Sequence, residues 1–294
     1  MSPSVLGIVG GSGLYDIEGL EDARWEAVKS SFGEPSDELF FGTIAGQSVV
    51  FLPRHGRGHR LSPSGINYRA NIDALKRAGV TDILSLSACG SLKQQLPPGS
   101  FVLVDQFIDR TLAREKSFFG NGLVAHVSMA EPVCGRVGGL VGRAADSADI
   151  PLTQGGTYLA MEGPQFSSQA ESHLYRGWGC DVIGMTNMPE AKLAREAEIC
   201  YTSVAMVTDY DCWNDDHDNV EVADIIRVLN DNAERAKRLV VALAALFAET
   251  RHPCVQGCDR VLDTALITAP GTRDPAMVAR LDAVAGRVLG GENE

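Results

Sequence analysis

The chain has 294 residues, of which 45% are hydrophobic and 22% charged, a composition that allows one large buried core or two modest ones. Its 38 acidic residues against 26 basic ones give a formal net charge of −12, which lacks the broad positive field that binding a nucleic-acid backbone requires. The longest apolar run near the C-terminus, residues 239–248, has about half the length that crosses a bilayer. We therefore expect neither a nucleic acid nor a membrane as a partner.

Short β-branched runs alternate with helical patterns along the chain. The strands that we expect are 5–9, a pair within 39–53 that turns at Ala45-Gly46, 81–87, 101–104, 156–160, 182–185 and 201–208. The helices that we expect are 67–78, 132–148, 190–197 and 220–247. Strands separated by helices predict an α/β fold with a central mixed, largely parallel sheet flanked by helices.

No internal repeat or low-complexity tract interrupts this pattern, so we expect a single domain over residues 1–250. The segment 251–294 differs, because it contains Pro253, two cysteines, Pro270-Gly271 and then an amphipathic stretch at 275–289. We interpret it as a C-terminal extension that packs on the core or on a neighbouring subunit.

Two turns that follow expected strands could hold an anion. Residues 10–13 read Gly-Gly-Ser-Gly, whose backbone N–H groups and Ser12 hydroxyl could donate to an anion, although a plain tight turn is an open alternative. The dinucleotide fingerprint fails there at Asp16, and no P-loop lysine follows. Arg54 and His55 follow the second strand of the 39–53 pair and offer a guanidinium fork and a ring donor, or else a solvated basic turn.

A third turn follows the strongly apolar strand 81–87. Ser87 and Ala88 there offer a hydroxyl and backbone N–H groups that suit a phosphate or a sugar hydroxyl. Cys89 lacks an evident partner base, so a small buried thiol is the favoured interpretation over a nucleophile.

Two carboxyl groups follow the strand 201–208. If extended geometry persists, Asp209 and Asp211 share one face and Tyr210 faces the other way. Two close carboxyl groups raise one pKa, so that one of them can stay protonated and donate to a departing base nitrogen. A metal-binding pair and a solvated loop remain alternatives, and we interpret the acidic run 214–218 as a solvated loop that caps the next helix.

Nine short motifs occur in an order that identifies a family. They are GGSGL, RHG, NYRANI, SACGSL, DQFIDRT, MAEP, EGPQFSSQAES, MTNMPEAKLAREAEICY and TDYDCW. Over about residues 5–248 they resemble the methylthioadenosine phosphorylase branch of the trimeric purine nucleoside phosphorylase family. The resemblance implies reversible phosphorolysis of methylthioadenosine to adenine and 5-methylthioribose 1-phosphate, by a homotrimer of the nucleoside phosphorylase fold. It also implies no metal and no organic cofactor, with inorganic phosphate as co-substrate.

The resemblance assigns roles to single residues. It implies a phosphate site made of Ser12, Arg54, His55, Ser87, Ala88 and Thr186. Met185 would pack on the ribose, Phe166 would stack near the purine, and Asp209 and Asp211 would face N7 and the exocyclic amine. His126 would reach the 5′-alkylthio group of an adjacent subunit. Serine stands at 12 and 87 where many relatives have threonine, which keeps the hydroxyl.

Other functions stay open at this stage. The first alternative is a phosphorylase of the same fold that acts on 6-oxopurine nucleosides or methylthioinosine, and the second is a hydrolase. A non-catalytic purine-binding protein is the alternative from another class, although adenine binding alone needs no phosphate site.

The cysteines and the start of the sequence indicate the compartment. Seven scattered cysteines form no regular framework, and no positive segment precedes the first apolar run, so we expect reduced thiols and a soluble, cytoplasmic protein. Cys254 and Cys258 could form a disulfide or bind a metal with an external ligand, but two free thiols is the favoured interpretation.

Overall fold

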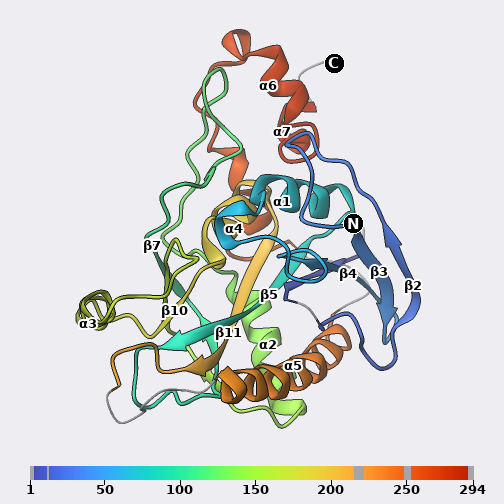
Figure 1. Cartoon of the computed structure of the whole chain (residues 1–294). Coiled ribbons are helices and arrows are strands. Elements are labelled where there is room, and N and C mark those ends of the chain that lie inside the picture. Colours follow the sequence, from blue (N-terminus) through green and yellow to red (C-terminus); the bar gives the residue numbers. More distant parts are fainter. Residues whose placement is uncertain (1–2, 12, 215–221, 248–252, 291–294) are drawn as a thin grey trace.

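The structure is a computed structural model that describes residues 3–11, 13–214, 222–247 and 253–290 (Figure 1). Its centre is a mixed sheet of eleven strands within those residues. The strands are β1 (Leu6–Gly10), β2 (Glu21–Glu26), β3 (Leu39–Ile44), β4 (Gln47–Pro53), β5 (Asp82–Ser91), β6 (Phe101–Val104), β7 (Gln106–Asp109), β8 (Leu152–Gln154), β9 (Thr157–Ala160), β10 (Val182–Gly184) and β11 (Cys200–Asp209). The helices are α1 (Tyr68–Arg77), α2 (Gly135–Ser147), α3 (Gln169–Gly177), α4 (Asn187–Glu196), α5 (Val222–Ala244), α6 (Pro275–Arg280) and α7 (Gly286–Leu289). Short 3₁₀ turns lie at Pro63–Gly65, Cys258–Asp263 and Pro270–Thr272.

Strand β5 is the hub of the sheet. The main path runs β2-β3-β4-β1-β5-β10-β9-β7, and β11, β6 and β8 branch from β5 in that order. β1 is parallel to both β4 and β5, and β5 is parallel to β11 and antiparallel to β10. The four strands β1, β4, β5 and β11 therefore end at the same edge of the sheet, where ligands of open α/β sheets bind.

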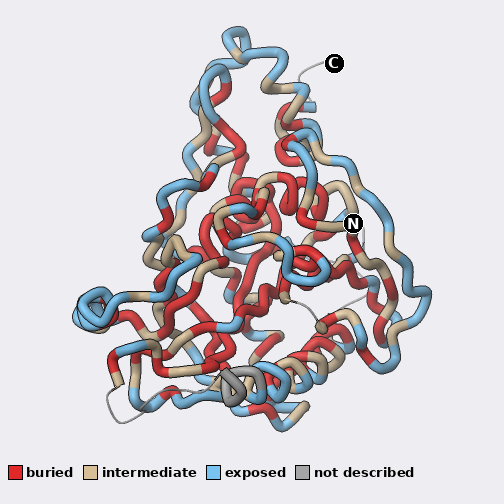
Figure 2. Tube along the Cα trace, viewed as in Figure 1, coloured by how far each residue is buried: buried red, intermediate tan, exposed pale blue. Residues whose placement is uncertain are grey.

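Alternating side chains divide the core between the two faces of the sheet. Ile83 packs in a cluster with α1 and α4, whereas Leu84 packs in a second cluster with α2 and α5. Figure 2 shows the buried residues gathered along the strands and on the inner sides of these helices. The nearly continuous apolar runs of β1, β4 and β5 follow from burial on both faces.

The predicted α/β fold with a mixed, largely parallel sheet is confirmed. Each strand and helix predicted from the sequence has a counterpart, with β5 extending four residues beyond the predicted end at Ser87. The sequence interpretation missed β2, β7, β8 and α3. β2 lies at the sheet margin and is almost wholly exposed, so it has no apolar alternation to detect.

The C-terminal extension packs on the side of the sheet that carries α1 and α4 (Figure 1). Its buried residues Leu262, Leu281 and Leu289 join the same apolar cluster as α1 and α4. Backbone hydrogen bonds join it to an earlier segment, since His126 N donates to Ala265 O across 2.9 Å. In the described residues, no helix is long and apolar enough to cross a membrane.

Candidate active site

The candidate site lies where β1, β4, β5 and β11 end. Gly10 pairs with Pro53 in the parallel ladder, and the N–H of Arg54 donates to the Gly10 carbonyl across 2.9 Å. The turn after β1 and the turn after β4 are therefore side by side. Ser12, the predicted hydroxyl of the first turn, lies outside the described residues.

The last part of β5 opens toward this edge. Ala88 is the one exposed residue of β5, between the buried Ser87 and Cys89. The hydroxyls of Ser87 and Tyr158 are buried and make no well-formed hydrogen bond in the part of the chain that the structure describes. Since buried hydroxyls are normally satisfied, this pair has capacity for a polar ligand.

Arg54 is buried and bonded to a carboxylate that sequence reasoning missed. Its Nε donates to Glu190 Oε2 across 2.7 Å and its Nη2 to Glu190 Oε1 across 3.1 Å, with both side chains at most 3% exposed. Nη2 also donates to the Ser85 hydroxyl and Nη1 to the Leu86 carbonyl. In the described residues, these partners use four of the five guanidinium N–H groups of Arg54 and leave one on Nη1. The predicted contact of Arg54 with phosphate stays a prediction, and in this arrangement it has a single N–H rather than a fork.

His55 is held as a neutral ring. Its Nδ1 lies 2.8 Å from the Leu61 carbonyl, which only accepts, so Nδ1 carries the hydrogen and Nε2 is the acceptor. Burial lowers the pKa of His55 to about 4, and the charge of Arg54 acts in the same direction. The ring also stacks on His59, with centroids 4.1 Å apart. Nε2 of His55 can therefore accept a hydrogen bond from a protonated oxygen of a bound anion.

The two predicted carboxyl groups lie together, although the strand does not continue through them. β11 ends at Asp209 after a bulge, and Asp211 has a positive φ of 54°. The N–H of Asp211 donates to Asp209 Oδ1 across 2.8 Å. A Cβ at Gly90 would lie 3.0 Å from Asp209 Oδ1 and 3.4 Å from the Asp211 Cβ, so both groups flank β5 at that glycine. Tyr210 packs on Trp213, and the extended geometry on which the predicted alternation depends does not persist at Asp211.

The pKa of the Asp211 carboxyl group is raised. Burial is the main cause of that raised pKa, and the neighbouring Asp209 adds to it, against a lowering by the Ser172 and Ser167 hydroxyls. A carboxyl group with a raised pKa can donate a proton or a hydrogen bond nearer to neutral pH. The sequence interpretation had Asp209 as the acid and Asp211 as its partner, and that assignment of roles stays a prediction.

The turn after β10 completes the edge. Thr186 is buried at the N-terminus of α4, and its side chain makes no capping hydrogen bond. A Cβ at Gly184 would lie 1.9 Å from the Tyr158 hydroxyl, so a glycine is required for that hydroxyl to lie against β10. Met185, between Gly184 and Thr186 in the sequence, is half-buried.

A second arginine that the sequence interpretation missed fixes the loops around Met185. The guanidinium of Arg114 donates to the carbonyls of Met185 and Met188 at 2.6 and 2.7 Å and to that of Glu162 at 2.8 Å. Hydrogen bonds from Ser64 and from the N–H groups of residues 112–113 hold the pKa of Glu162 below its usual range, against burial, which acts to raise it. No sequence pattern predicts these hydrogen bonds of Arg114, because their acceptors are backbone carbonyls, which every residue has.

Two predicted substrate residues are exposed on this chain. The side chain of Phe166 is 81% exposed on the loop between β9 and α3. His126 is exposed on the segment that pairs with the C-terminal extension. Their predicted contacts with purine and with the 5′ group of a neighbouring subunit stay predictions.

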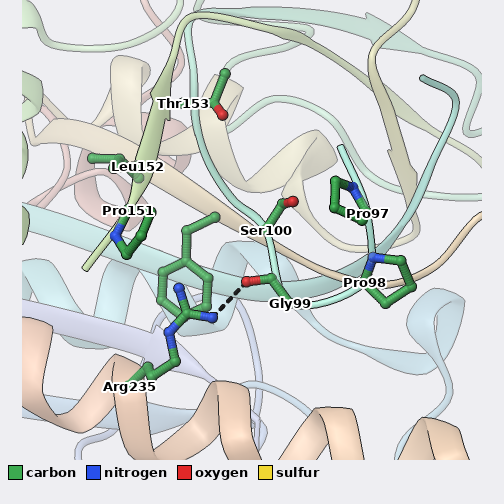
Figure 3. Close-up of a pocket in the computed structure, with 9 residues that line it drawn as sticks. Pro97, Pro98, Gly99, Ser100, Pro151, Leu152, Thr153 and Arg235 are labelled. Atoms are coloured by element: carbon green, nitrogen blue, oxygen red, sulfur yellow. Dashed lines mark hydrogen bonds between the residues drawn. The ribbon is translucent and has the colours of Figure 1, made fainter. Parts of the chain in front are cut away.

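A separate pocket of about 450 Å³ contains none of the predicted site residues (Figure 3). It is lined by Pro97, Pro98, Gly99, Ser100, Phe101, Pro151, Leu152, Thr153 and Arg235. Arg235 lies over the Phe101 ring at 4.5 Å. It also donates to the Gly99 carbonyl, as Figure 3 shows. This pocket has no carboxylate to recognise a purine.

Comparisons with known proteins identify the family of the chain. The sequence profile of the phosphorylase superfamily matches residues 5–245. The S-methyl-5′-thioadenosine phosphorylase of Bradyrhizobium diazoefficiens is 65% identical, over 99% of this chain and 100% of the relative. That of Rhodospirillum rubrum is 63% identical, over 97% of each chain.

Solved structures give the same family. The crystal structure of a methylthioadenosine phosphorylase from an antarctic soil metagenomic library is 44% identical with a TM-score of 0.91, over 97% of this chain and 99% of the other. The methylthioadenosine phosphorylase of Schistosoma mansoni in complex with adenine is 36% identical with a TM-score of 0.77, over 83% and 91%. The chain therefore belongs to the phosphorylase superfamily, and its relatives there are S-methyl-5′-thioadenosine phosphorylases.

Proposed function

We propose that the protein catalyses the phosphate-dependent cleavage of S-methyl-5′-thioadenosine to adenine and 5-methylthioribose 1-phosphate, in purine and methionine salvage. The relatives that carry this name are up to 65% identical over nearly the whole chain. The observation that carries the proposal is the position of the Asp209–Asp211 pair against Gly90, on the same strand as Ser87 and Ala88.

The spacing along β5 suits a nucleoside with phosphate beneath its sugar. Ser87 and Gly90 are three residues apart, which at about 3.3 Å per residue separates the anion-binding turn from the carboxyl pair by about 10 Å. A ribose ring would bridge these two regions, with its anomeric carbon between the phosphate and the base. Ser87, Thr186 and local N–H groups would orient the phosphate, with His55 as an acceptor.

Breaking the glycosidic bond leaves positive charge on the ribose and negative charge on the base. An oriented phosphate stabilises the positive charge of the transition state and then attacks the anomeric carbon. The carboxyl pair protonates or hydrogen-bonds N7 of the departing base, and general-acid help of this type contributes about 10²–10⁴-fold in rate. Phosphate supplies the charge, so we propose no metal and no organic cofactor in this step.

The same pair supports the choice of a 6-aminopurine. A carboxyl oxygen accepts from the 6-amino group of adenine, whereas an ionised carboxyl repels the 6-oxo group of hypoxanthine. A site that hydrogen-bonds an amino group strongly rejects substrates that lack it. The alternative is a phosphorylase that acts on 6-oxopurine nucleosides or on methylthioinosine. The assay that separates these two functions also measures the preference for the 5′ substituent.

The test is release of free base from a panel of nucleosides with and without phosphate. The panel holds methylthioadenosine, adenosine, methylthioinosine and inosine. The proposal expects base release from methylthioadenosine that requires phosphate and is faster than from methylthioinosine. Base release without phosphate would indicate a hydrolase, faster cleavage of methylthioinosine would indicate the 6-oxopurine alternative, and binding of adenine without turnover would indicate a purine-binding protein.

We further propose that the protein acts as a homotrimer in the cytoplasm. The exposed Phe166 and His126 support an assembly in which a neighbouring subunit covers the substrate. Light scattering coupled to gel filtration measures the mass of the assembly. A monomer with full activity would contradict the proposed role of His126.

A further inference from the structure

Four cysteines from distant parts of the sequence lie together outside the candidate active site. Cys134 precedes the first residue of α2, Cys200 begins β11, and Cys254 and Cys258 belong to the C-terminal extension. All four side chains are buried, and their sulfur atoms all lie within 4.8 Å of one another. No other group of three or more candidate metal ligands occurs in the described residues.

The separations fit a single metal ion better than a pair of disulfides. A tetrahedral zinc ion with Zn–S bonds of about 2.3 Å places neighbouring sulfur atoms about 3.8 Å apart. The sulfur atoms of Cys134 and Cys254 are 3.6 Å apart. A disulfide needs about 2.05 Å, and none of the seven cysteines forms one in the described residues.

We propose that Cys134, Cys200, Cys254 and Cys258 bind one Zn²⁺ in a closed tetrathiolate site that fastens the C-terminal extension to the core. Four thiolates around one ion is the usual donor set of structural zinc. The sequence analysis favours free thiols at Cys254 and Cys258, because nothing in the sequence shows that Cys134 and Cys200 lie beside them. The proposal replaces these free thiols with zinc-bound thiolates.

The local backbone holds the two extension cysteines on one side of a turn. Gly257 N donates to the Cys254 carbonyl across 2.8 Å, and Gly257 has a φ of 69°, in the left-handed region. The N–H of Cys254 donates to Asp259 Oδ2 across 3.1 Å. On the core side, Cys134 N donates to the Tyr201 carbonyl across 2.7 Å, which places Cys134 beside Cys200.

Two cations adjoin the cluster. The charge of Arg136 acts on Cys200 and Cys134, and the charge of Arg195 acts on Cys258. Zinc with four thiolates carries a net charge of −2, which the guanidinium of Arg195 offsets in part, whereas Arg136 is already ion-paired with the buried Asp82. Outer partners of this type orient the ligands and tune affinity for the metal.

The site is structural and remote from the proposed chemistry. Cys200 and Asp209 are the two ends of the ten-residue strand β11, so about 30 Å separates the cluster from the carboxyl pair. Four protein ligands leave no open coordination position for a substrate or water. The metal would fix the extension, whose backbone carries the Ala265 carbonyl that pairs with His126.

The first experiment measures metal and thiols in the intact protein, purified without a metal-chelating column or added metal. Elemental analysis by mass spectrometry is expected to give about one zinc per chain. A thiol count of the unfolded, metal-stripped chain is expected to give all seven cysteines. Four missing thiols without metal would overturn the proposal in favour of two disulfides, and iron at the same stoichiometry would overturn the identity of the ion.

Variants locate the ion. Cys258→Ser is expected to lower the zinc content at least tenfold, whereas Cys180→Ser, a buried cysteine outside the cluster, keeps it. If Cys258→Ser fails to fold, the wild-type chain is loaded with Co²⁺ in place of zinc, and sulfur-to-cobalt charge-transfer absorption of a tetrahedral site is expected. Zinc retained by Cys258→Ser, or cobalt that gives no thiolate absorption, would exclude the site.

Discussion

The backbone N–H of Asp211 donates to the side-chain Oδ1 of Asp209 across 2.8 Å. The two carboxyl groups are therefore parts of one turn, and the positive φ of Asp211 at 54° lets the chain reverse within it. A change at position 209 can disturb this turn as well as the proposed chemistry, so a variant that keeps the Oδ1 acceptor is the informative one.

Asp209→Asn keeps that acceptor and removes the acid. We expect kcat/KM for methylthioadenosine to fall about 10²–10⁴-fold, because the variant loses general-acid help to N7. An amide also donates to a 6-oxo group, so cleavage of methylthioinosine is expected to rise relative to methylthioadenosine. The measurement is the rate of phosphate-dependent base release on both nucleosides.

A matched control changes an exposed acid elsewhere. Asp149 is exposed beyond α2 and has a positive φ of 52°, which asparagine adopts readily. Asp149→Asn is expected to keep wild-type rates on both substrates. Unchanged cleavage of methylthioadenosine by Asp209→Asn would remove this residue from the mechanism.

The raised pKa of Asp211 predicts the pH dependence of activity. Burial and the neighbouring Asp209 favour its protonated form in the folded protein. If that form is needed, kcat/KM is constant at low pH and falls as the pH rises through the raised pKa. Asp211→Asn cannot ionise, so the alkaline fall that this group causes is expected to vanish from its pH–rate profile. An identical fall in both proteins would assign it to another group.

The sequence could predict the strands and turns of the site but not the partners that join them. Buried runs such as β4 and the polar turns after them are local signals, so Arg54, Ser87 and Asp209 could be chosen without a structure. Glu190 could not, because it is 136 residues from Arg54 and lies in an ordinary helical pattern. The same holds for Cys134, which meets Cys254 from 120 residues away.

The ion pair of Arg54 with Glu190 predicts a large loss of stability on neutralising one partner. Both side chains are buried, so Glu190→Gln leaves a guanidinium charge in the core without a counter-ion. The expected cost is about 3–5 kcal/mol in the free energy of unfolding. Urea denaturation measures it, with the exposed Glu34→Gln as control, which is expected to change stability by less than about 0.5 kcal/mol. A small cost of Glu190→Gln would contradict the role of this carboxylate as the counter-ion of Arg54.

Glu196 gives the fold a pH-dependent stability independent of catalysis. It is the last residue of α4, and its carboxyl oxygens accept from the Ser117 hydroxyl and the Phe118 N–H, each across 2.7 Å. Burial raises its pKa from 4.5 to about 7 despite these two donors. At about 1.4 kcal/mol per pKa unit, keeping Glu196 ionised in the folded state costs about 3 kcal/mol.

The folded state therefore binds the Glu196 proton more tightly than the unfolded chain does. Its contribution to stability is fully present below pH 4.5 and is lost as the pH rises from 4.5 to about 7. Glu196→Gln does not ionise, and its amide can accept from Phe118 and donate to Ser117, so we expect the variant to be more stable than wild type at pH 8 and not at pH 4.5. Urea midpoints at both pH values measure this. Glu115→Gln, at a side chain that is 75% exposed, is the control and is expected to follow the wild type. A variant that loses as much stability as the wild type between the two pH values would show that Glu196 ionises freely in the folded chain.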